Sequence, residues 1–169
     1  AEIDNVNGFD RLFLTKNIAT FTVDSNPYAI VTSWEDSVQV IDLSDPTNIV
    51  VTDTEIDGYN GFTALDDANR IDSFTIGSST YVITVSSKDD GVQIINVSDP
   101  TNIVAVDAET EGSNGFTELD GAQDVDTFTI GSRTYAIVVT YGDGVQIIDI
   151  SDPSNIVATD AETDGVNGF

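Results

Sequence analysis

The chain has 169 residues, 40% of them hydrophobic, which is enough for one globular domain with a core of its own. Thirty acidic residues against five basic ones give a net charge of −25, which disfavours nucleic acid and anionic membrane surfaces as partners. Histidine and cysteine are absent, so the chain has no disulfide framework and no Ser–His or Cys–His nucleophile system. The absence of a long apolar run predicts no membrane span. The acidic charge favours solubility and suits an extracellular or cell-surface, saline setting, where salt screens repulsion.

A repeated motif divides the chain into units. The sequences VQVID, VQIIN and VQIID each lead into Ser-Asp-Pro, with 54 residues from Asp45 to Asp99 and 53 from Asp99 to Asp152. A fixed period of this size indicates a repeat architecture, in which each unit buries its apolar face against its neighbours. We therefore expect a single repeat domain over 1–169, with units at 10–62, 63–116 and 117–169, and residues 1–9 as the tail of a preceding unit.

Each unit is expected to form four antiparallel strands. Alternating or β-branched apolar residues separated by turn signals are typical of strands. In the middle unit the strands are predicted at 71–76, 80–85, 92–97 and 103–107. Gly77-Ser78, Lys88 to Gly91 and Ser98 to Asn102 provide the turns between them. In the first unit, Asn26-Pro27 stands in the place that we assign to the Gly-Ser turn.

The connectors between units carry a repeated Phe-x-x-Leu pair. Gly61 to Leu65 and Gly115 to Leu119 follow this pattern, and Gly8 to Leu12 opens the chain in the same way. A phenylalanine and a leucine three residues apart predict a short helical turn that pins two apolar side chains between sheets.

A four-stranded unit of about 50 residues fits a β-propeller blade, although turn-rich spacing of this kind also allows a β-sandwich. At GVQIIDISDP (144–153), preceded by TFTIGSRTYAIVV (127–139), the chain resembles the LVIVD-repeat proteins. That resemblance covers nearly the whole chain and implies β-propeller blades of bacterial and archaeal surface or secreted proteins. The fold class is therefore expected to be all-β, a repeat protein of about three four-stranded antiparallel sheets.

The number of blades predicts assembly. Propellers close with about four to eight blades, and three units leave open flanks. We expect completion by other copies or by a longer parent chain, with a homo-oligomer or an open filament as the forms of self-assembly.

An acidic loop follows the last strand of each unit. Oxygen-bearing side chains at positions 1, 3 and 5, followed by glycine at 6, match the opening of a calcium loop. Glu118 falls at position 12 of the middle loop, where calcium loops place a bidentate carboxylate. The candidate Ca²⁺ ligands are Asp53, Glu55, Asp57, Asn60, Asp107, Glu109, Glu111, Asn114, Glu118, Asp160, Glu162, Asp164 and Asn167. The alternative is a solvated outer edge, where charge prevents pairing with other chains.

The leading functional hypothesis is a non-catalytic extracellular or cell-surface scaffold, with no organic cofactor, whose partners are copies of itself or another protein or carbohydrate. The alternatives are a lectin-like or polysaccharide-binding module and a glycoside hydrolase that uses two carboxylates. One asymmetric pocket would favour an enzyme, the same pocket in several units would favour a repeated binder, and large apolar contacts between copies would favour a scaffold.

Overall fold

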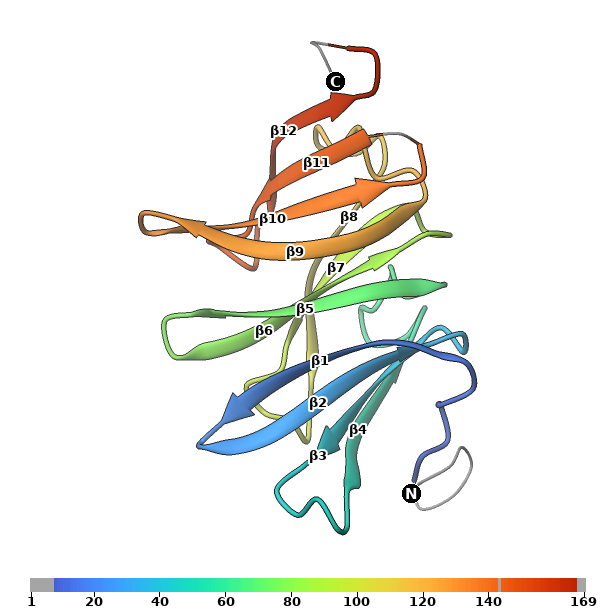
Figure 1. Ribbon diagram of the computed structural model, residues 1–169, viewed down its shortest axis with the longest axis vertical. Helices are drawn as coiled ribbons and strands as arrows, with labels where there is room; N and C mark the ends of the chain where they lie inside the picture. The colour runs from blue at the N-terminus through green and yellow to red at the C-terminus, as the bar shows by residue number, and fades with distance from the viewer. Residues whose placement is uncertain (1–7, 143, 167–169) are drawn as a thin grey trace.

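The computed structural model describes residues 8–142 and 144–166, which form twelve β-strands (Figure 1). Sheet I contains β1 (Thr15–Val23), β2 (Asn26–Ser33), β3 (Ser37–Asp42) and β4 (Val50–Ile56). Sheet II contains β5 (Ala68–Ile76), β6 (Ser79–Ser86), β7 (Gly91–Asn96) and β8 (Val104–Thr110). Sheet III contains β9 (Ala122–Ile130), β10 (Arg133–Thr140), β11 (Gly144–Asp149) and β12 (Val157–Thr163).

Each sheet is an antiparallel meander in which strands adjacent in sequence are hydrogen-bonded neighbours. The three sheets follow one another along the long axis of the molecule, and their first strands β1, β5 and β9 lie side by side (Figure 1). This arrangement confirms the all-β fold of three four-stranded sheets. Each of the expected units 10–62, 63–116 and 117–169 contains one sheet.

The hydrophobic core consists of separate layers between the sheets. One cluster joins sheets I and II and contains Phe62 and Leu65, and a second joins sheets II and III and contains Phe116 and Leu119. All four of these side chains are fully buried. The connector pairs therefore occupy the core position that the sequence predicts.

The predicted helical turn in these connectors is wrong. Asn60 and Gly61 both take positive φ, at 52° and 86°, and a right-handed helix cannot pass through that conformation. The segment instead closes as tight turns, in which Phe62 N donates to the carbonyl of Tyr59 at 2.8 Å and Gly58 N donates to the carbonyl of Phe62 at 2.8 Å.

The first turn of sheet I also differs from the sequence prediction. Asp24 and Ser25 form the turn, with φ of 49° and 69°, while Asn26 and Pro27 begin β2. Both turn residues take positive φ, as a two-residue hairpin turn of type I′ requires, and aspartate tolerates that conformation better than most residues.

Candidate functional site

A β-bulge in the fourth strand of each sheet sets the direction of the acidic side chains. Register shifts occur between Val40 and Ile41, between Ile94 and Ile95, and between Ile147 and Ile148. On the partner strand each shift skips one residue, which immediately precedes Asp53, Asp107 or Asp160. These three aspartates occupy position 1 of the acidic loops. A bulge redirects the following side chain, and in sheets I and II it turns the aspartate toward the next sheet.

The first acid of the loop ties one sheet to the next. Asp53 Oδ2 accepts a hydrogen bond from Ile103 N of sheet II at 2.7 Å. Asp107 Oδ2 accepts one from Ile156 N of sheet III at 2.9 Å. In each case the other carboxylate oxygen accepts the N–H of the following residue, at 2.8 Å from Thr54 and at 3.0 Å from Ala108. Each carboxylate thus accepts one backbone donor of the next sheet and one of its own strand.

The other acids of the first two loops hold the connector in place. Asp57 accepts the N–H of Leu65 at 3.0 Å, and Glu111 accepts the N–H of Leu119 at 2.7 Å. Asn60 Nδ2 donates to the carboxylate of Glu55 at 3.0 Å, and the pair of Asn114 and Glu109 repeats this contact at 2.8 Å. The loop residues therefore position the buried Phe and Leu side chains.

The third loop differs at its first acid, which has no following sheet within residues 8–142 and 144–166. The Asp160 carboxylate there accepts the N–H of Ala161 at 3.0 Å, Asp164 is exposed, and Glu162 lies half-buried in β12. Glu118 of the middle loop accepts a hydrogen bond from the Thr163 hydroxyl and fills the space beside Gly144. Asn167 lies outside the described residues.

These positions bear directly on the calcium hypothesis. Across residues 8–142 and 144–166, no three acidic side chains gather into a group that could hold a metal ion. A calcium ion at the first or second loop would need Asp53 or Asp107 to exchange backbone donors for the metal. Calcium binding stays a prediction, and so does the solvated-edge alternative.

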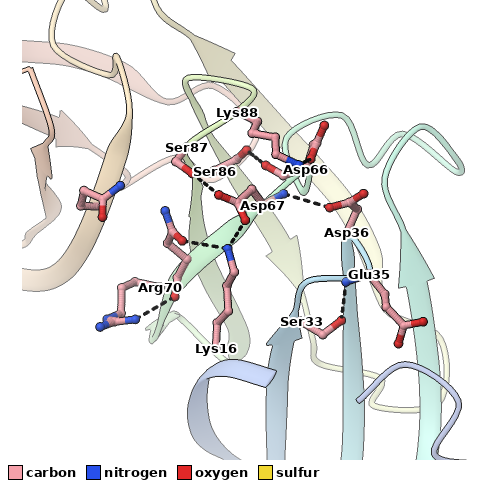
Figure 2. A network of polar contacts seen from close by, with 12 residues as sticks. Lys16, Ser33, Glu35, Asp36, Asp66, Asp67, Arg70, Ser86, Ser87 and Lys88 are labelled. Atoms are coloured by element: carbon pink, nitrogen blue, oxygen red, sulfur yellow. Dashed lines mark hydrogen bonds and ion pairs between the residues drawn. The ribbon is translucent and has the colours of Figure 1, made fainter. Parts of the chain in front are cut away.

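A polar cluster that the sequence did not indicate lies between sheets I and II (Figure 2). Lys16 of β1 is only 11% exposed at its side chain; it pairs with Asp67 and donates to Asn69 Oδ1 at 3.0 Å. Asn69 Nδ2 in turn donates to the carbonyl of Ala122 at 3.1 Å, so the contacts extend to sheet III. Asp36 Oδ1 accepts the N–H of Asp67 at 3.1 Å.

The electrostatics of this cluster differ from one carboxyl to the next. Burial and the charge of Asp66 raise the pKa of Asp36. Burial likewise raises the pKa of Asp89, with the charges of Asp57 and Asp66 adding to the effect. Burial would also raise the pKa of Asp67, but hydrogen bonds from Lys16 and Ser87 and the lysine charges outweigh it and hold that pKa below its usual range.

Two equivalent hollows lie between successive first strands. One, of about 270 Å³, is lined by Phe21, Thr22, Ser73, Phe74, Thr75 and Thr80. The other, of about 280 Å³, is lined by Ser73, Phe74, Thr75, Thr127, Phe128, Thr129 and Thr134. Beside them, each sheet stacks a phenylalanine on a tyrosine at centroid distances of 5.5 to 5.6 Å. The hollows repeat with the units and combine hydroxyl groups with aromatic rings.

Comparison with known proteins defines the class of fold. No protein-family model matches the chain, and no curated protein matches it. Solved structures do match. A thermostable family-43 glycoside hydrolase aligns with a TM-score of 0.58 at 12% identity, over 91% of this chain and 55% of its own. A protein from Lactobacillus plantarum aligns at 0.56 and 14%, over 84% and 40%. The WD40 domain of SCAP from fission yeast aligns at 0.51 and 11%, over 87% and 32%.

These neighbours have β-propeller folds, and the three sheets of this chain are β-propeller-like blades. The chain spans about a third to just over half of the length of each. At such low identity the likeness concerns the fold alone. None of the described residues forms a helix long and apolar enough to cross a membrane.

The sequence did not indicate the Lys16 cluster because its members come from different repeats. Lys16 has no opposite residue in the pairing of β1 with β2, and Asn69 has none in the pairing of β5 with β6. Gln123 is skipped in the same way in β9. A polar residue that changes identity at one position of otherwise similar repeats is the signal that could have found this cluster.

Proposed function

We propose that this chain is a non-catalytic structural and interaction scaffold built of β-propeller-like blades, located outside the cell or on its surface, and able to self-assemble. The observation that carries the proposal is the use of the acidic side chains. Asp53 and Asp107 accept backbone N–H groups of the next sheet, and Asp57 and Glu111 accept those of the connectors. These carboxylates thus serve to join rigid sheets, and the motif resemblance to LVIVD-repeat surface proteins supports the same role.

A panel of soluble polysaccharides and aryl glycosides tests the absence of catalysis. We expect no reducing sugar or aryl alcohol above the blank during long incubation at high protein concentration. Release of product that disappears in an Asp36→Asn or Asp89→Asn variant would contradict the proposal, because burial raises the pKa of both carboxyls, which is the direction that favours a general acid.

Labelling of intact and permeabilised cells of the native host with an antibody tests the location. A surface scaffold is labelled equally in both preparations. Labelling only after permeabilisation would contradict the surface assignment.

A repeated carbohydrate binder is the second candidate, and the two equivalent hollows favour it. Aromatic rings and hydroxyl groups are what a sugar ring contacts through its apolar face and its hydroxyls. Phe74 and Thr75 line both hollows, so a Thr75→Trp substitution would obstruct the two together. A glycan array should then show binding by the unmodified chain and none by the variant, while Thr101→Trp, in an exposed turn, is the control.

A further inference from the structure

We infer that the open face of sheet III binds the open face of sheet I in a second copy of this chain, and that two copies close a ring of six blades. The inference rests on the proposed scaffold function and names its partner. By the open face of a sheet we mean the face that no other sheet of the described chain covers. Sheet I turns one such face away from sheet II, and sheet III turns one away from sheet II.

The open face of sheet III is equivalent, one repeat later, to the face of sheet II that packs against sheet III. Val85, Ile83 and Ile94 of sheet II are fully buried there. Their counterparts one repeat later are Val139, Ile137 and Ile147, and all three retain exposed surface, with Val139 at 40%. The same side chains therefore lack only the neighbour that covers them in sheet II.

The open face of sheet I is the matching half. Phe9, Ala29, Val31 and Ile41 form a small apolar cluster on it that is already buried within one copy, so Ile18 supplies the exposed apolar surface of this face. Ile18 is 58% exposed on this sheet, although its counterparts Ile71 and Val125 are each 6% exposed because the preceding sheet covers them. A hollow of about 250 Å³ beside Lys16, Ile18 and Val31 marks the place where a preceding sheet would pack.

Polar groups at the two open faces are complementary as well. Asp160 corresponds to Asp53 and Asp107, yet it has no partner on a following sheet within the described chain. Ile49 corresponds to Ile103 and Ile156, and no carboxylate of the described residues accepts its N–H. In the assembled ring, Asp160 of one copy accepts the N–H of Ile49 in the other.

The turn that contains the repeated proline supports this pairing. Pro100 and Pro153 are buried, whereas Pro46 of sheet I is exposed. Thr52 donates to the carbonyl of Pro100 between sheets I and II at 2.6 Å. Its counterpart Thr159 donates to the carbonyl of Val157 in its own strand. A second copy at the open face of sheet III would give Thr159 the carbonyl of Pro46 and would cover that proline.

Closure fixes the number of copies. Propellers close with about four to eight blades, so one copy is too few and three copies are too many. Two copies related by a twofold axis along the propeller axis make both contacts at once. Each copy carries a net charge of −25, so the ring should form more readily when salt screens the repulsion.

The mass of the full chain in solution, measured by light scattering across a range of concentration and salt, tests this inference. We expect twice 18.0 kDa at high salt, with dissociation on dilution into low salt. A particle of 18.0 kDa under all conditions would overturn the inference, and a mass that keeps rising with concentration would overturn the closed ring. Neither result bears on catalysis, which the polysaccharide panel tests separately.

Two variants test the choice of faces. Val139→Lys and Ile18→Lys each place a charge on one open face at a residue that is exposed within a single copy, so each should fold and stay monomeric. Mixing the two variants should restore a dimer, because one intact face remains on each partner. Val104→Lys is the control, since the equivalent valines 50, 104 and 157 are 47%, 49% and 48% exposed in all three sheets. Failure of the mixture to dimerise would overturn the head-to-tail contact.

Discussion

At the scale of single residues, the acidic side chains of this protein act as acceptors for backbone N–H groups. The carboxylates of Asp45, Asp99 and Asp152 each accept the N–H and hydroxyl of the residue two positions later. Those hydrogen bonds hold the pKa of all three aspartates below the usual range. The sequence identifies these turns because the partners are adjacent, which is how aspartate commonly stabilises a turn.

The inter-sheet carboxylates could not be identified in the same way. Asp53 and Ile103 are 50 residues apart, and the bulge that directs the aspartate depends on strand register. The spacing of the acidic loop alone resembles that of a calcium loop. Its first acid, in the first two units, has a backbone partner that only the packing of sheets reveals.

Removing one inter-sheet carboxylate should destabilise the protein. Asp107→Ala leaves the N–H of Ile156 without its acceptor, which is expected to lower the free energy of unfolding by about 1–3 kcal/mol. Asp120→Ala is the matched control, because it removes the same charge from an exposed position. Urea denaturation followed by tryptophan fluorescence measures both, and equal effects would contradict the structural role of Asp107.

Asp36 should make stability depend on pH in a defined direction. Its folded pKa lies above the ordinary value of 3.8, so the ionised carboxyl costs stability at neutral pH, and this cost disappears as pH falls below 3.8. Asp36→Asn keeps an acceptor for Asp67 N and suits the positive φ of 52°. We expect a higher melting temperature for the variant at pH 7 and a difference that shrinks toward zero at low pH.

Asp24→Asn is the control, since it makes the same change in an exposed turn at φ of 49°. A variant at position 36 that melts below the unmodified protein at pH 7 would contradict the assignment.

At the scale of elements, the repeat determines most of what could be predicted. The four strands of the middle unit begin and end within a few residues of their predicted bounds, because alternation and β-branched runs are local signals. The helical turn in the connector was wrong because Asn60 and Gly61 leave the helical region. What holds the connector is its buried Phe and Leu, which the spacing did indicate.

The connector phenylalanines should therefore account for much of the packing between sheets. Phe116→Ala removes a fully buried ring from the cluster between sheets II and III, at an expected cost of about 3–5 kcal/mol. Phe13→Ala, where the ring is 57% exposed, should change stability little. Chemical denaturation of both variants makes the comparison, and a small effect at Phe116 would contradict the layered core.

At the scale of the whole molecule, repulsion between the acidic side chains opposes the apolar packing between the sheets. Thirty acidic residues on a small surface repel one another, while the apolar layers between sheets hold the chain together. Raising the NaCl concentration from ~0.02 to ~0.5 M shortens the screening length severalfold and should raise the melting temperature. A melting temperature that falls or stays level would show that repulsion does not limit stability.

The effect of added calcium distinguishes a calcium site from a solvated edge in the acidic loops, provided that it is separated from the general screening by salt. A site in the loops should raise the melting temperature at millimolar CaCl₂ well above the effect of MgCl₂ at equal ionic strength, since Mg²⁺ demands stricter geometry. Equal effects of the two salts would favour the solvated edge. Scanning calorimetry in both salts gives the comparison.

Amide hydrogen exchange at Ile103 and Ile156 tests the central claim, that carboxylates of one sheet hold the backbone of the next. Both amides lie just before a fourth strand, and each donates to an aspartate of the preceding sheet. We predict strong protection at both, lost selectively at Ile103 in Asp53→Ala and at Ile156 in Asp107→Ala. Exchange of these amides at the rate of the exposed turns in the unmodified protein would contradict the account.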